Sequence, residues 1–214
     1  DKSARGTVPH DPERENEMYP TREEAERLLK EAVPHNPGPW EGHSRVTAHC
    51  AEKIAGACVG LDPDKAYVFG LLHDIGRRFG VRHLGHVSDG FSYMTSLGYD
   101  EVAKICLTHS FHTLKLEDYV GRQDVSKEEM RLILSELAKV QLDDYDRLIQ
   151  LCDTLAGGDR VMDMEERMDD VQRRYGSYPQ EKREAKRQIR KYFEDWAGRD
   201  IYDIVEKDTF RLKE

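Results

Sequence analysis

Apolar residues recur along most of the chain at the three- and four-residue spacing of one helix face. Such stripes predict helices over about 41–59, 81–97, 100–109, 127–140 and 144–156, with further helices over about 161–175 and 180–197. Thr21 and Ser126 each stand three residues before a Glu, a capping-box pattern that begins a helix. No useful length of sequence alternates between apolar and polar residues as a half-buried strand does. The sequence therefore predicts an all-α fold.

One predicted helix differs from the others because it has no polar face. Residues 66–72 are apolar or small all round, which is typical of a buried helix. They lead directly into His73 and Asp74, so the helix end carries an imidazole and a carboxylate into the interior. An uncompensated buried carboxylate is very costly. We therefore expect Asp74 to have a cationic partner, either a basic side chain or a metal ion.

Length and composition predict one main domain with a helical appendage. The chain has 214 residues, of which 38% are aliphatic or aromatic and 35% charged, as in a globular protein with charged helix faces. We expect residues 1–19, which are polar and aperiodic, to be a disordered N-terminal extension. Residues 20–160 would form the main domain, and 161–214 a helical extension packed on it. Because the chain does not begin with Met, we expect a fragment, with Met18 as a candidate start.

Charge and cysteine content exclude several classes of partner. A net charge of −9 argues against binding a nucleic acid polymer, although a local basic pocket for a small anion remains open. No apolar run approaches the roughly 18 residues of a membrane span, and no secretory signal is visible. The four scattered cysteines lie among apolar residues, which predicts reduced core thiols in a cytoplasmic protein. The oligomeric state is left open.

Six polar residues fall on apolar helix faces and are candidate metal ligands. They are His43, His73, Asp74, His86, His109 and Asp153. A single buried histidine usually bonds a backbone carbonyl, but this many titratable groups on five helices would compete for few partners. Imidazole and carboxylate without thiolate suit iron, manganese, zinc, nickel or cobalt better than magnesium or calcium. Six ligands exceed those of one catalytic zinc, which leaves room for two divalent ions.

The order of these residues resembles a known family. His43, then the His73–Asp74 pair, then Asp153 are similar to the H…HD…D pattern of the HD superfamily of metal-dependent phosphohydrolases, which are all-α. The resemblance covers about residues 20–157, with residues 71–76 reading Leu-Leu-His-Asp-Ile-Gly. It identifies the 20–160 segment as an HD-domain helical bundle, to which the extra C-terminal helices are appended.

Dinuclear members of that superfamily imply a ligand set for two ions. His86 and His109 look like the additional histidines of the HD-type diadenosine tetraphosphate hydrolases and of the HD-type mixed-valent diiron oxygenases. One ion would then be held by His43, His73, Asp74 and Asp153. Asp74 would bridge to a second ion held by His86 and His109. Iron or manganese is expected first, with zinc, nickel and cobalt open.

Residues around this set are candidate catalytic and substrate-binding groups. Asp74 and Arg77 are predicted to be catalytic, and Arg77 stands where the superfamily commonly has Lys. Arginine suits bidentate contact with phosphate oxygens. Candidate substrate-binding residues are Arg45, Arg77, Arg78, His83 and His112. The basic face of the last long helix, formed by Lys182, Arg183, Lys186, Arg187, Arg190 and Lys191, is interpreted as solvated, and nothing beyond about residue 160 is assigned a function.

The resemblance implies three candidate functions. The favoured one is a phosphohydrolase that cleaves a phosphate ester or anhydride of a small, nucleotide-like substrate with a metal-activated water. The second is a mixed-valent diiron oxygenase acting on an organophosphonate or related substrate with the same ligands. The third is a non-catalytic nucleotide-binding HD domain. Because all six ligand positions are intact, the sequence argues against the third.

Overall fold

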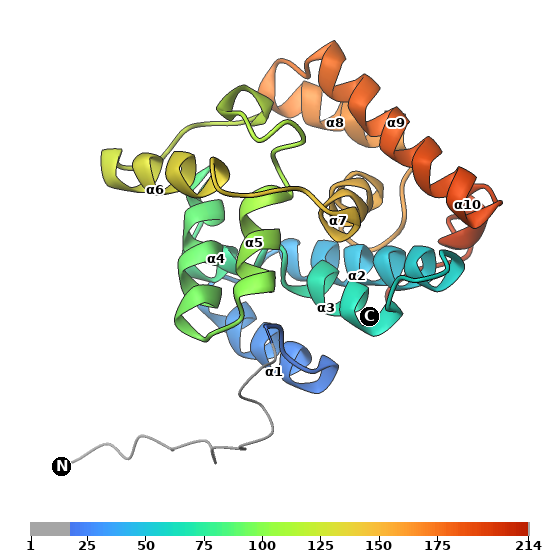
Figure 1. Ribbon diagram of the computed structural model, residues 1–214, viewed down its shortest axis with the longest axis horizontal. Helices are drawn as coiled ribbons and strands as arrows, with labels where there is room; N and C mark the ends of the chain where they lie inside the picture. Colours follow the sequence, from blue (N-terminus) through green and yellow to red (C-terminus); the bar gives the residue numbers. More distant parts are fainter. Residues whose placement is uncertain (1–17, 214) are drawn as a thin grey trace.

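The computed structural model describes residues 18–213, which form ten α-helices joined by loops and three short 3-10 turns (Figure 1). The α-helices are α1 (Arg22–Ala32), α2 (Trp40–Ala57), α3 (Pro63–Leu72), α4 (Gly85–Ser96), α5 (Asp100–Thr108), α6 (Lys127–Leu137), α7 (Asp144–Leu155), α8 (Met164–Tyr175), α9 (Gln180–Ala197) and α10 (Ile201–Ile204). The 3-10 turns are η2 (Val33–His35), η3 (Ile75–Phe79) and η4 (Leu116–Asp118). Over these residues the predicted all-α fold is confirmed, since extended pairing is limited to the isolated bridges Ala156–Val161 and Arg160–Arg211.

Side-chain caps explain where several helices begin. The Thr21 hydroxyl accepts a hydrogen bond from the Glu24 amide at 3.3 Å and starts α1. Ser126 and Glu129 form a reciprocal capping box at the start of α6. At α3, the Asp62 carboxylate accepts from the next free amides, and Pro63 occupies the first helical position. These caps supply acceptors for amides that have no partner within their own helix.

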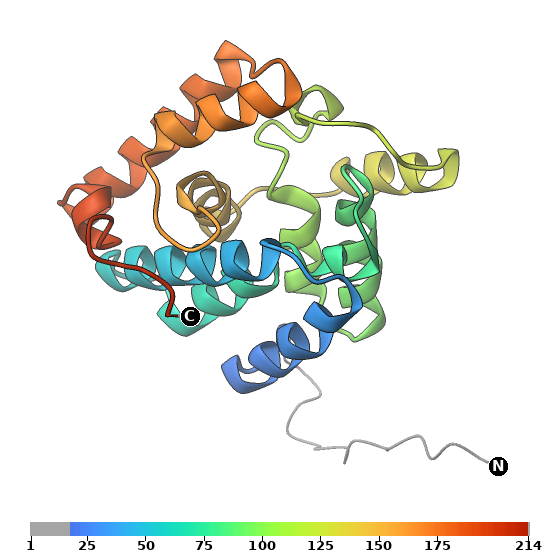
Figure 2. The same ribbon diagram turned by 180° about the vertical axis from the view of Figure 1, so that it is seen from behind.

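Helix α7 lies at the centre of the molecule. Seen end-on in Figures 1 and 2, it has α2 and α3 on one side and α8 and α9 on the other, while α5 approaches it from a third direction. Its apolar residues Leu148, Ile149, Leu151, Cys152 and Leu155 are fully buried. The apolar segment 66–72 of α3 is also largely buried, as its sequence predicts. The side chains of α7 are therefore surrounded by helices from both halves of the chain.

The C-terminal helices share the main core with the rest of the described chain. Met168 of α8, Phe193 of α9 and Ile201 of α10 belong to the same buried cluster as Leu71 and Leu151. The boundary near residue 160 stays a prediction. The predicted disorder of residues 1–19 falls almost wholly on residues 1–17, outside the described part.

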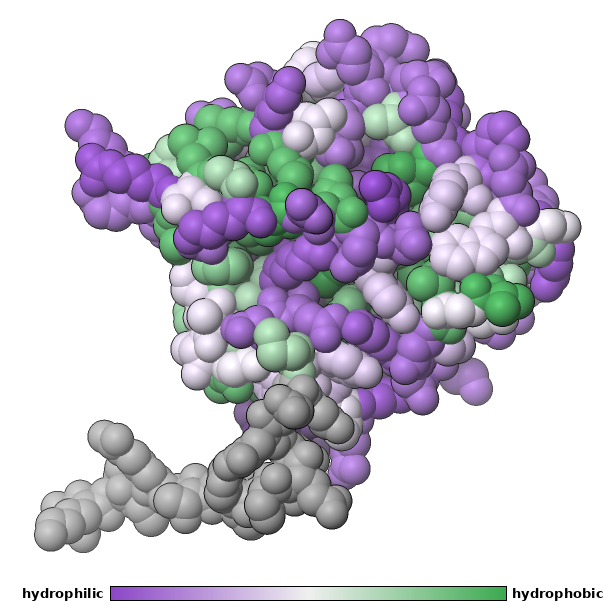
Figure 3. All heavy atoms as spheres, viewed as in Figure 1, coloured by the Kyte–Doolittle hydropathy of each residue, from purple (hydrophilic) through white to green (hydrophobic). Residues whose placement is uncertain are grey.

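Helix length and surface hydropathy describe the exterior of the protein. Among residues 18–213, no helix has both the length and the apolar character needed to cross a bilayer. The face drawn in Figure 3 is largely hydrophilic, with an apolar area near α6. A second, smaller core cluster lies there, and it includes Phe111, Ile133 and Leu137.

Two glycines let backbone segments approach closely around the His-Asp pair. A Cβ on Gly76 would lie 2.0 Å from the His86 carbonyl oxygen and 2.5 Å from the Gly90 nitrogen, so α4 rests directly on η3. A Cβ on Gly42 would lie 1.8 Å from the Gly158 carbonyl oxygen, so the start of α2 rests on the loop after α7. Both contacts fix the separation of elements that carry candidate metal ligands.

We predict that Gly76→Ala destabilises the protein by about 1–3 kcal/mol, because the added methyl group meets backbone atoms that cannot rotate away. Gly56→Ala is the matched control. Its nearest neighbour would be Pro63 at 3.8 Å, and alanine favours the helix by roughly 0.5–1 kcal/mol. Urea unfolding measures both variants, and equal stability of the two would contradict the close packing of η3 against α4.

Candidate metal centre

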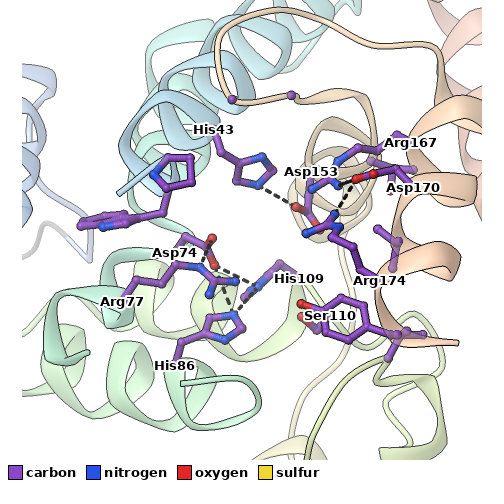
Figure 4. Close-up of a pocket in the computed structure, with 18 of the residues that line it drawn as sticks. His43, Asp74, Arg77, His86, His109, Ser110, Asp153, Arg167, Asp170 and Arg174 are labelled. Atoms are coloured by element: carbon purple, nitrogen blue, oxygen red, sulfur yellow. Dashed lines mark hydrogen bonds and ion pairs between the residues drawn. The ribbon is translucent and has the colours of Figure 1, made fainter. Parts of the chain in front are cut away.

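All six candidate ligands converge at one end of the helical core. His43 comes from the first turn of α2, and His73 ends α3, with Asp74 directly after it. His86 lies in the first turn of α4, His109 ends α5, and Asp153 lies in the last turn of α7. Figure 4 shows the side chains of His43, Asp74, His86, His109 and Asp153 directed toward one cavity. His73 and Asp74 are 1% and 3% exposed, as predicted for the end of a buried helix.

Each of the four histidines is oriented by a backbone carbonyl. The Nδ1 atoms of His43 and His73 lie 3.2 Å from the Ala156 oxygen and 2.7 Å from the Gly70 oxygen. His109 Nδ1 lies 2.9 Å from the Cys106 oxygen, and His86 Nδ1 contacts the oxygen of His83. A carbonyl oxygen can only accept, so every Nδ1 is the donor. In a neutral ring this leaves Nε2 as a lone pair directed to the centre, as metal-binding histidines require.

The Nε2 atoms and the carboxylates form two groups that share Asp74. One consists of His43, His73 and Asp74, and the other of Asp74, His86 and His109, with all ligand atoms in a group within 4.8 Å of one another. Asp74 Oδ1 lies 3.2 Å from His86 Nε2 and 3.6 Å from His109 Nε2. Asp153 Oδ1 adds to the first group, 2.9 Å from His43 Nε2 and 3.8 Å from His73 Nε2.

Several buried atoms at the centre have acceptor capacity that the protein leaves unused. His73 Nε2 and Asp74 Oδ1 are buried without a hydrogen bond within the described chain. His86 Nε2 and His109 Nε2 are 3.2 Å apart, and with both Nδ1 protons committed their lone pairs face each other. Unpaired buried acceptors are rare in folded proteins. A dication between these atoms would satisfy them, so the residues present fit a divalent metal.

Electrostatics keep the centre rich in unprotonated ligands. Burial alone would raise the pKa of Asp74, but Arg77, His73 and His86 outweigh it and hold that pKa well below its usual range. The same balance of burial against nearby imidazoles lowers the pKa of Asp153. Burial, reinforced by the charge of His73, lowers the pKa of His109 to about 3. Carboxylates and neutral imidazoles are the forms that bind metal.

The centre opens into a cavity of about 650 Å³, of the size that holds a small ligand. Arg77 lines it and forms an ion pair with Asp74, with 2.5 Å between Nε and Oδ2. His83 lies in a neighbouring cavity that also contains Tyr119 and Tyr175.

The other predicted substrate-binding residues do not line the cavity. Arg45 pairs with Glu41 and Glu26 at 3.1 and 2.9 Å. Arg78 donates to the Tyr93 hydroxyl at 2.5 Å, and His112 lies 3.3 Å from the Asp118 carboxylate. The geometry therefore gives no support to a substrate-binding role for Arg45, Arg78 and His112.

Another part of the cavity wall comes from α8 and α9, which the sequence had left without a function. Arg167 and Arg174 of α8 and Lys182 and Lys186 of α9 line the cavity. The interpretation of the basic face of α9 as solvated is wrong for Lys182, Arg183 and Lys186, which are 8%, 9% and 3% exposed. The apolar stripe on the same helix had indicated that a different face of α9 is the buried one.

The fold and the centre together define an all-α protein whose histidines and aspartates can hold metal ions. Comparison with protein-family models matches residues 40–158 to the HD domain. The match covers more than half of the chain and includes all six candidate ligands, so the chain belongs to the HD domain family of mostly metal-dependent hydrolases. No curated protein and no solved structure matched the chain.

We predict two metal ions per chain at saturation, with Asp74 shared between them. Asp74→Ala should lower the occupancy of both sites, because both groups contain this carboxylate. His109→Ala should mainly empty one. Elemental analysis of the dialysed variants measures this. One ion per chain, unchanged in His109→Ala, would contradict a dinuclear centre.

We predict that the buried amino group of Lys186 lowers the free energy of unfolding of the protein at neutral pH. Burial, with the nearby charge of Lys182, lowers the pKa of Lys186 from 10.5 to about 7. Between pH 7 and 10.5 the lysine is protonated in the unfolded chain but largely neutral in the folded protein. The contribution of Lys186 to the free energy of unfolding therefore rises with pH. Lys186→Met should therefore be more stable than the parent by about 2–4 kcal/mol near pH 7, and the gain should shrink toward pH 10.

Urea unfolding at both pH values tests this prediction. Lys191→Met is the control, because Lys191 is 74% exposed on the same helix and pairs with Asp195. A loss of stability in Lys186→Met at neutral pH would show that the ammonium is favourably compensated within the free protein.

Proposed function

We propose that this protein is a phosphohydrolase that cleaves a phosphate ester or anhydride of a small, nucleotide-like molecule with two divalent transition-metal ions. The observation that carries the proposal is the convergence of four carbonyl-oriented imidazoles and two carboxylates on a cavity lined by cationic side chains. His43, His73, Asp74 and Asp153 would hold one ion, and His86 and His109 the other, with Asp74 between them. When bound, such ions polarise phosphoryl oxygens and lower the pKa of water.

The protein's own groups would prepare the site before the substrate arrives. The backbone carbonyls at Ala156, Gly70, His83 and Cys106 fix the four imidazole rings, so little reorganisation is needed when the ions bind. Asp74 places one oxygen toward His86 and His109 and the other toward Arg77. The buried surroundings exclude bulk water and strengthen electrostatic interactions with the substrate.

Arg77 would stabilise negative charge on the phosphoryl oxygens. Its Nε is 2.5 Å from Asp74, which leaves the two terminal nitrogens of the guanidinium for a substrate anion. Asp74 also fixes the orientation of this side chain at the cavity wall. Arg78, by contrast, is directed toward the Tyr93 hydroxyl and its ring, whose centroid lies 4.5 Å from the guanidinium carbon.

Arg77→Ala should keep its metal and lose catalytic efficiency by about 2–4 kcal/mol, because a contact made in the transition state is removed. Arg78→Ala is the matched control and should do much less. Steady-state kcat/KM and metal content are measured on both. Equal effects at the two arginines, or loss of metal in Arg77→Ala, would contradict this role.

The source of oxygen in the product separates hydrolysis from iron-dependent oxygenation by the same ligand set. A panel of nucleotides and phosphoesters is assayed in labelled water, with and without dioxygen. We expect turnover to persist anaerobically and label from water to enter the product phosphate. Strict dependence on iron and dioxygen would instead indicate an oxygenase acting on an organophosphonate or related substrate. Ligand binding without turnover across the panel would indicate a non-catalytic nucleotide-binding domain.

A further inference from the structure

Two lysines of α9 occupy unusual positions in the cavity wall. Lys182 and Lys186 are four residues apart, so they lie one above the other on the same helix face. Both line the cavity that contains Asp74 and Asp153, and they are only 8% and 3% exposed. Both lie outside residues 40–158, the segment that matches the HD domain.

The partners of both ammonium groups are neutral. Lys182 Nζ donates to the Asp118 carbonyl at 2.5 Å and to the Ser110 carbonyl at 3.3 Å. Lys186 Nζ donates to the Gln150 carbonyl at 2.6 Å. Among residues 18–213, no carboxylate oxygen lies within 4.0 Å of either Nζ, the distance that defines an ion pair. Their neighbour Arg183 differs, because it pairs with Asp169 at 2.7 Å and Glu165 at 3.4 Å.

Charge balance therefore points to an anion in the cavity. An ammonium held away from water by neutral carbonyls is costly unless an opposite charge compensates it. Burial lowers the pKa of Lys182 to about 8, and the negative charges of Asp153 and Asp118, which lie beyond ion-pair distance, only partly offset this effect. The adjoining wall adds positive charge, since Arg167 and Arg174 both pair with the single carboxylate of Asp170, at 3.3 and 2.9 Å.

We propose that Lys182 and Lys186 form a second anion subsite, and that the substrate carries two anionic groups. One is the phosphoryl group that reacts at the Asp74 centre, and the other is a phosphate or carboxylate bound by the two lysines. The first placement rests on the proposed function, whereas binding at the lysines needs no turnover. The two lysines then select against monoesters whose remainder is neutral.

Matched phosphonates that cannot be hydrolysed test the subsite directly. Methylphosphonate carries one anionic group. Diphosphonates with spacers of one, two and three carbons add a second phosphonate, and phosphonoacetate adds a carboxylate instead. Calorimetric titration of the metal-loaded full chain gives each Kd, and metal analysis after titration checks for chelation. The parent should bind at least one two-anion probe about tenfold or more tightly than methylphosphonate.

Variants identify the lysines as the source of that preference. In Lys182→Met and Lys186→Met, affinity for the preferred two-anion probe should fall toward that of methylphosphonate, so that the ratio of the two Kd values approaches one. Lys186→Arg, which keeps the charge, should retain most of the preference. Lys191→Met removes one exposed charge from the same helix and should leave every Kd unchanged.

Two results would overturn the subsite: no two-anion probe binds more tightly than methylphosphonate, or the preference survives both methionine variants. Failure of the proposed function looks different. A lysine-dependent preference without hydrolysis of any phosphate ester or anhydride would remove the hydrolase and keep the subsite. Hydrolysis of a phosphate ester or anhydride without a lysine-dependent preference for two-anion probes would keep the hydrolase and remove the subsite.

Discussion

The hydrogen bonds from four imidazole Nδ1 atoms to backbone carbonyls are the constraint on which the centre depends. Each carbonyl belongs to a helix or to its immediate flank, so the rings are held by the fold itself. Because Nδ1 is committed, every Nε2 is left facing the two aspartates without a proton to donate. The protein thus brings together buried acceptors that a metal cation would satisfy, in agreement with its membership of the HD domain family.

The rest of the architecture holds these rings together. The central helix α7 brings Asp153 between the two halves of the chain. Gly42 allows the start of α2 to lie against the loop after α7, and Gly76 allows η3 to lie against α4. On the side away from α2, α7 is covered by α9 (Figure 2), and Lys182 and Lys186 of α9 line the same cavity as Asp74. The candidate metal centre therefore shares its cavity with two buried lysines that have no ion-pair partner among residues 18–213.

The candidate ligands could be predicted from sequence because each is a polar residue on an otherwise apolar stripe, as His109 is in α5. The all-apolar helix before His73 likewise predicted burial of the His-Asp pair. Lys182 and Lys186 could not be recognised, because helical periodicity does not tell which neighbour covers a face. Their spacing on a basic helix suggests a solvated surface until α7 and the segment 110–118 are placed against it. Arg45 shows the converse, since its carboxylate partners on α1 and α2 draw it away from the cavity.

Anomalous diffraction from crystals of the protein purified without added metal tests the central claim most directly. The account predicts two anomalous peaks on either side of the Asp74 carboxylate, one bounded by the Nε2 atoms of His43 and His73 and the other by those of His86 and His109. In both, every Nδ1 should still donate to its backbone carbonyl. A single peak away from Asp74, or imidazoles rotated so that Nδ1 faces the ion, would contradict it.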